Sequence, residues 1–155
     1  MTHNSLILRI VILLAAFLTL SCQNNGRIGH WYGVWQVTGY TVDGADALTE
    51  QGRNTTFTFQ NNIVQVKWPE DAYQGSLLTI GTWQEQDGDK VTFNFMHHDD
   101  NYGPGQGVYS APAWLGMVST ELMHMTFTTR GGRDMTWTWT DPQGRRLVYN
   151  LHKQR

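Results

Sequence analysis

The residue types that most often bind metals come together at one place in this sequence, the run His97-His98-Asp99-Asp100. Imidazole nitrogens and carboxylate oxygens are ligands for zinc and other transition metals. Adjacent side chains on an extended chain point to opposite sides, however, so four consecutive residues rarely converge on one ion. We therefore expect a solvated loop at a strand end, and we predict no metal site and no other cofactor.

No arrangement of residues indicates catalysis. Ser110 and Ser119 have no His and Asp in a recognisable motif, and the chain carries no phosphate-binding loop or nucleotide fingerprint. The net charge of -2 gives no indication of nucleic acid binding. The sequence therefore predicts that the protein is not an enzyme.

Cys22 is the only cysteine, and it follows an apolar run from Ile10 to Leu20 that Arg9 precedes. This run is shorter than the roughly 20 residues that a membrane-spanning helix needs. Its length and its positive flank are typical of a secretory signal peptide. Because a single cysteine cannot form an intrachain disulfide, we expect packing alone to hold the fold.

The small Ser21 before Cys22 resembles the cleavage site of bacterial lipoproteins, although the residues preceding it are not the usual ones. The resemblance implies a signal peptide over 1–21, acyl chains such as palmitate on Cys22, and a tether over 22–30. The protein would then be anchored in the cell envelope, at the periplasmic or surface face of the outer membrane. The alternative is a plain signal peptide with an incidental cysteine.

The remainder, 31–155, is predicted to be one all-β domain. Apolar and polar residues alternate in eight short segments, and turn residues such as Asp87-Gly88 and Gly131-Gly132 join several of them. Eight antiparallel strands in up-and-down order close naturally into a barrel, while an open sandwich remains the alternative. The segment 45–53 is expected to be a loop. The predicted strands are 31–41, 54–60, 63–68, 76–86, 89–96, 121–130, 133–140 and 145–152.

The inward faces of these strands are apolar, and they offer no general acid or base that titrates near neutral pH. They predict a pocket for a hydrophobic or aromatic ligand, or else a core that its own large side chains fill. The facing of 76–86 is ambiguous between Leu78 with Ile80 and Leu77 with Trp83. The predicted ligand contacts are Trp68, Phe93, Phe95, Met125, Phe127, Trp137, Trp139 and Tyr149.

The segment 97–120 interrupts the alternation, and loops of this length are usually functional or disordered. It contains Trp114, Leu115 and Met117. These residues suit a lid over the barrel mouth or a patch for a protein or membrane partner. The other interpretation is a short helix or turn that caps the open end of the core.

Gly33-Val34-Trp35, Asp43-Gly44, Thr56-Phe57-Thr58-Phe59 and Gly81-Thr82-Trp83 together resemble the lipocalin-like domain of small secreted Bacteroidetes lipoproteins. The resemblance implies an up-and-down barrel with a ligand-binding cup. It also implies a basic residue near the last strand, Arg145 or Arg146 here, packed over the tryptophan of the opening strand.

These features predict an extracytoplasmic, lipid-anchored lipocalin-like protein that binds a small hydrophobic or aromatic ligand without catalysis. The alternative function is a protein-interaction or inhibitor module of the cell envelope. That alternative expects a filled barrel and an exposed Trp114 patch, and it expects a protein partner in place of the small ligand.

Overall fold

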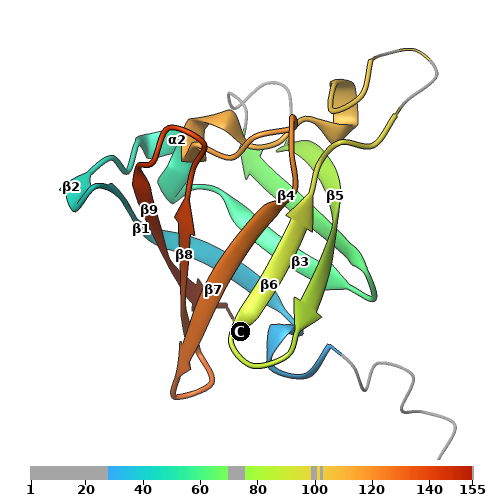
Figure 1. Cartoon of the computed structure of the whole chain (residues 1–155). Helices are drawn as coiled ribbons and strands as arrows, with labels where there is room; N and C mark the ends of the chain where they lie inside the picture. Colours follow the sequence, from blue (N-terminus) through green and yellow to red (C-terminus); the bar gives the residue numbers. More distant parts are fainter. Residues whose placement is uncertain (1–27, 70–75, 99–100, 102, 155) are drawn as a thin grey trace, which may run out of the picture.

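The computed structural model describes residues 28–69, 76–98, 101 and 103–154. Within them one antiparallel sheet follows the chain strand by strand, and the last strand pairs with the first to close a barrel (Figure 1). This closure excludes the open sandwich and confirms the predicted all-β barrel. The strands are β1 (Val34–Val42), β2 (Ala45–Asp46), β3 (Thr56–Gln60), β4 (Ile63–Pro69), β5 (Ser76–Gln86), β6 (Lys90–Asn94), β7 (Met123–Arg130), β8 (Asp134–Thr140) and β9 (Arg146–Lys153).

The eight long strands coincide with the predicted segments, apart from residues at their ends. The prediction of a loop over 45–53 is wrong, since this segment holds β2 and the helix α2 (Glu50–Arg53). Thr49 begins that helix, because its Oγ1 accepts a hydrogen bond of 3.1 Å from the Gly52 N–H. One helical turn is too short to show the apolar periodicity from which helices are predicted. No helix in the described part of the chain is long and apolar enough to cross a membrane.

Two tryptophans close one end of the barrel. Trp35 lies on β1, and its Nε1 donates a 2.8 Å hydrogen bond to the carbonyl of Trp31 in the 3-10 helix η1 (Gly29–Trp31). Both side chains are buried. Trp35 therefore plugs this end of the barrel, and Trp31 packs inward beside it.

Lys153, and not Arg145 or Arg146, packs over Trp35. Its Nζ lies 5.1 Å from the centre of the Trp35 ring, a cation–π contact, and donates to the His30 carbonyl at 3.1 Å. β9 runs toward the end of the barrel that Trp35 closes, so only the last residues of β9 reach Trp35. The expectation from the family resemblance is therefore wrong in the choice of residue.

Trp137 occupies the centre of the interior. Its ring lies 5.0 Å from Phe57 and from Phe93, and 6.1 Å from Phe59, measured between ring centres. These spacings are typical of packed aromatic pairs. The prediction of alternating inward residues is confirmed in β3, β6, β7 and β8, and in β1 as far as Val37, where the inward side chains are buried.

β5 presents Trp83 and Thr79 to the interior and turns Leu78 outward, which resolves the ambiguity of this strand. Gly81 lies between them on the same face. A Cβ atom there would lie 2.7 Å from the Phe95 ring. The missing side chain at this position gives Phe95 the room to pack against the barrel wall.

We predict that Trp137→Ala lowers the free energy of unfolding by about 3–5 kcal/mol, because it leaves a cavity among rings that strands hold in place. Chemical denaturation of the two proteins measures this difference. Thr138→Ala is the matched control, since it changes the next residue on the outer face of β8 and should cost less than about 1 kcal/mol. Equal losses in the two variants would contradict a core centred on Trp137.

Candidate binding site at the capped end of the barrel

A loop covers the end of the barrel opposite Trp35. It carries the 3-10 helix η3 (Ala113–Leu115), seen in Figure 1 among the segments that cross this end. Leu115 is 0% and Met117 2% exposed, and both belong to the main hydrophobic core. We call residues 113–117 the cap. This geometry matches the second sequence-based interpretation, a short helix that closes the core.

Three contacts attach the cap to the barrel. The Tyr149 hydroxyl donates a 2.9 Å hydrogen bond to the Leu115 carbonyl, and Trp114 Nε1 donates to Thr55 Oγ1 at 2.9 Å. The Trp114 ring also packs on Trp68, with ring centres 4.1 Å apart. Side chains from β9, β4 and the residue before β3 thus determine where the cap lies.

Gly116 allows the cap to approach the barrel closely. Its φ of +68° is in the left-handed region, and a Cβ atom there would lie 2.4 Å from the Tyr40 hydroxyl and 2.7 Å from Leu147 Cδ2. A side chain would therefore meet both backbone strain and steric overlap. Glycine at this position brings η3 down onto the strand ends.

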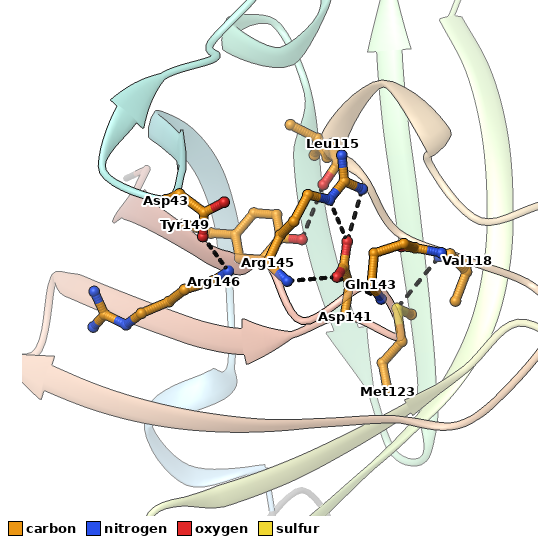
Figure 2. Close-up of polar contacts among 9 residues, drawn as sticks. All are labelled: Asp43, Leu115, Val118, Met123, Asp141, Gln143, Arg145, Arg146 and Tyr149. Atoms are coloured by element: carbon orange, nitrogen blue, oxygen red, sulfur yellow. Dashed lines mark hydrogen bonds and ion pairs between the residues drawn. The ribbon is translucent and has the colours of Figure 1, made fainter.

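Asp141 supports the β8–β9 turn next to the cap (Figure 2). Its Oδ2 accepts a hydrogen bond from Arg145 Nε and forms an ion pair with Nη2, both at 2.7 Å. Its Oδ1 accepts from the backbone N–H groups of Arg145 at 2.8 Å and Gln143 at 3.0 Å. Across the barrel seam, Asp43 Oδ1 accepts from the Arg146 N–H at 2.8 Å. The two carboxylates fix the loops around the mouth, a role that the sequence analysis did not assign to them.

The two tyrosines under the cap remain neutral at ordinary pH. Burial raises the pKa of Tyr149 well above its usual value, and the nearby Tyr40 and Asp141 add to the shift. Burial also raises the pKa of Tyr40, against the opposing effect of Arg145. Their rings stack at 5.1 Å. The site therefore offers phenolic hydroxyls, which donate hydrogen bonds to neutral or anionic oxygen acceptors.

The predicted ligand contacts do not form a single site. Phe93, Phe95, Met125, Phe127, Trp137, Trp139 and Tyr149 are all buried, as predicted. Phe127 lies toward the closed end, with its ring 4.8 Å from Trp31, whereas Trp139 pairs with Leu147 beside the cap. Trp68 does not reach the interior cluster and instead lies half-buried at the mouth against Trp114.

Alternation of apolar residues could not reveal the polar side chains at the capped end. Thr55 and Thr79 are buried threonines, and Thr79 Oγ1 donates to the Val108 carbonyl at 2.8 Å in the loop that leads to the cap. Tyr40 was not assigned to an inward face either. Tyr40 lies three residues after Val37 and would face outward in a regular strand. A β-bulge between Val37 and Gly39 reverses the facing of β1 and turns Tyr40 inward.

The polar run at the end of β6 is only partly described, because Asp99 and Asp100 lie outside the described residues. His97 Nε2 is 3.1 Å from Thr82 Oγ1, and His98 is exposed. Among the residues whose placement is described, no three His, Cys, Asp or Glu side chains gather as a metal would require. Cys22 also lies outside the described residues.

Ionised Asp141 should stabilise the fold in a pH-dependent way. Burial raises the pKa of its carboxyl group, but the hydrogen bonds and charge of Arg145 outweigh this and hold the pKa below the usual 3.8. A carboxyl group with a lowered folded-state pKa stabilises the protein above its unfolded pKa, and this contribution disappears as the pH falls through the folded value.

We therefore predict that acidification below about pH 3.8 destabilises the natural protein more than it destabilises Asp141→Asn. Thermal unfolding midpoints across a series of acidic pH values measure the difference. Asp87→Asn, in the exposed β5–β6 turn, is the control and should keep the natural acid dependence. An Asp141→Asn variant with the same acid dependence as the natural protein would refute the assignment.

No protein-family model and no curated protein matches the sequence. The solved structures that share its fold include two from Bacteroides species. A lipocalin-like protein from Bacteroides uniformis aligns with a TM-score of 0.55 at 13% identity, over 81% of this chain and 100% of its own. An uncharacterized protein from Bacteroides eggerthii aligns with a TM-score of 0.55 at 15% identity, over 80% of this chain and 99% of its own. The described part of this chain therefore has the fold of a lipocalin-like domain.

Proposed function

We propose that the protein binds a small apolar molecule, without catalysis, in space that opens beneath the cap. One observation carries the proposal: the side chains that fill the mouth, Leu115 and Met117, come from a loop and not from a strand. A loop can move away without breaking the barrel, whereas Trp35 at the closed end is part of β1. The lipocalin-like fold supports a binding role, since the mouths of β-barrels are frequent ligand sites.

The energies are compatible with a cap that opens. Burial of Leu115 and Met117 contributes about 1.5–3 kcal/mol each, and the hydrogen bond from Tyr149 adds about 1 kcal/mol. These contributions place the open state about 4–7 kcal/mol above the closed one, so it is populated at roughly 0.1% or less before a ligand binds. A ligand that buries a similar apolar area replaces what the cap loses and shifts the equilibrium toward the open state.

The site defines the ligand by shape and polarity. The walls are apolar and aromatic, with Trp139 and Leu147 paired beside the mouth. When the Leu115 carbonyl withdraws, the neutral Tyr149 hydroxyl loses its acceptor. We therefore propose a hydrophobic or aromatic ligand with one oxygen acceptor that replaces this carbonyl.

A second function is favoured by the filled interior. Phe57, Phe93 and Tyr149 each contact Trp137, and these four side chains are 0% exposed, as is Trp35. A solid barrel suits a protein-interaction or inhibitor module of the cell envelope. Trp114 would take part only after the cap moves, because its ring is half-buried against Trp68.

The proposed location of the protein is the cell envelope. The apolar run before Cys22 supports export, and the position of the only cysteine directly after it supports lipidation. Several acyl chains on one residue would anchor the protein stably, since each buried CH₂ contributes about 0.8 kcal/mol. The described domain would then lie outside the cytoplasm, joined to the membrane by a short tether.

Loosening the cap should strengthen binding of an apolar probe. We predict that Tyr149→Phe, which removes the hydrogen bond to Leu115, tightens binding of N-phenyl-1-naphthylamine, an apolar dye without an oxygen acceptor, by several-fold, up to about tenfold for 1.4 kcal/mol. Fluorescence titration measures the dissociation constant. Thr138→Ala on the outer wall is the control, and near-ultraviolet circular dichroism verifies that each variant remains folded.

Native mass spectrometry of the protein purified from its own host provides the direct test. A bound small molecule in the natural protein would support the proposal and give the mass of the ligand. A protein free of ligand, combined with no change in dye binding for Tyr149→Phe, would refute the small-molecule function and favour the interaction module.

Lipidation is tested separately. We predict that the natural protein, expressed in its host, incorporates radiolabelled palmitate and sediments with membranes, whereas Cys22→Ser does neither and remains in the soluble fraction. Ser21→Ala, which keeps a small residue before the cysteine, is the matched control and should be lipidated. Membrane association of Cys22→Ser equal to that of the natural protein would contradict the anchor.

A further inference from the structure

An open hollow of about 850 Å³ lies on the barrel wall, and its polar side chains face away from the interior. Its floor is formed by the outward residues of β5, β6 and the start of β7, and the β3–β4 turn forms one rim. The volume is within the roughly 300–1,000 Å³ of small-molecule sites. This hollow, which we call the outer groove, is distinct from the proposed site beneath the cap.

The floor of the outer groove is a regular polar array. Strand pairing places Gln84 beside Thr92 and Thr92 beside His124, in one row across the three strands. Thr92 Oγ1 accepts a 3.1 Å hydrogen bond from Gln86 Nε2 and lies 3.0 Å from His124 Nδ1. These bonds fix the positions of side chains that would otherwise rotate freely in water.

Side-chain amides dominate the outer groove. Among the residues that the structure describes, the side-chain amides of Asn61, Asn62 and Gln84 have no hydrogen-bond partner. Gln86 and Asn94 line the same groove. Each amide donates through its nitrogen and accepts through its oxygen, about 2 Å apart. An array of this kind complements a ligand whose neighbouring groups also both donate and accept.

The charges in the outer groove are few. Glu85 Oε2 already accepts a 2.7 Å hydrogen bond from Trp31 Nε1. Asp87 lies at the end of the lining, and neither Lys nor Arg is among the lining residues. A phosphate or a carboxylate ligand would lack a cationic partner here, and a lipid chain would lie on amides and hydroxyls that need hydrogen bonds.

We propose that the outer groove binds a neutral oligosaccharide. Vicinal sugar hydroxyls donate and accept at the spacing that side-chain amides provide, and the exposed Leu122 at the rim offers apolar contact for a sugar ring. An extended peptide fits less well, because a peptide strand needs a free sheet edge and most of β5 is already paired with β4. This pairing extends to Trp83, whose N–H donates a 2.9 Å hydrogen bond to the Asn62 carbonyl. The remaining free edge of β5 is three residues long, Gln84 to Gln86.

The affinity of the outer groove should be low. The aromatic ring in its lining, Trp83, is 6% exposed and packs inward on Trp31 and Phe59. Without an exposed ring for stacking, hydrogen bonds must provide most of the binding free energy. Because each contributes only about 0.5–1.5 kcal/mol in water, we expect millimolar dissociation constants.

The experiment is a nuclear magnetic resonance titration of the ¹⁵N-labelled protein with neutral oligosaccharides of glucose, galactose, mannose and xylose. We expect at least one to cause saturable shifts, concentrated at Thr82, Gln84, Thr92 and His124. Gln84→Ala should weaken the binding of that sugar at least threefold. Thr128→Val changes the floor of a second outer hollow, over β7 to β9, and should leave the affinity unchanged.

Three results would overturn the proposal. They are no saturable shift with any of the four sugars, shifts that do not centre on the outer groove, or equal affinities for Gln84→Ala and the natural protein. Binding of a strand-forming peptide in place of the sugars would instead identify β5 as a docking edge. The Tyr149→Phe variant should bind the sugar unchanged, so this test is independent of the function proposed for the interior.

Discussion

The pairing of β9 with β1 is the constraint on which the rest of the structure depends. Closing the sheet directs every second side chain of each long strand into one confined space. The chain fills that space with aromatic rings around Trp137, and the only cysteine lies outside the described residues. The described barrel is therefore held by backbone pairing in its wall and by packing in its interior.

The two ends of the barrel are closed by different means, and the proposed binding function depends on this difference. At one end Trp35 is part of β1, where it donates a hydrogen bond to the Trp31 carbonyl and packs under the Lys153 ammonium group. At the other end a loop supplies Leu115 and Met117, and long-range hydrogen bonds attach it to the strands. Because a loop can be displaced while the strands stay paired, the proposed ligand would enter at the capped end.

Much of the fold could be predicted because strand formation is encoded locally. The alternation in Met135-Thr136-Trp137-Thr138-Trp139 needs no distant contact to be recognised, and the turns around it carry glycine. The site could not be predicted to the same degree. The contact between Tyr149 and Leu115 joins residues that are 34 apart, and that between Trp114 and Thr55 joins residues 59 apart. A single sequence contains the residue types of such contacts but not their pairing.

The tryptophan pair at the mouth gives the cap an optical property of its own. Trp68 and Trp114 have ring centres 4.1 Å apart, with planes inclined at 56°, and both are half-buried at the mouth of the barrel. Two indoles at this separation and inclination couple their electronic transitions, which produces paired bands of opposite sign in circular dichroism. The coupling falls steeply with distance. The natural chain therefore carries a built-in reporter of cap position that requires no added label.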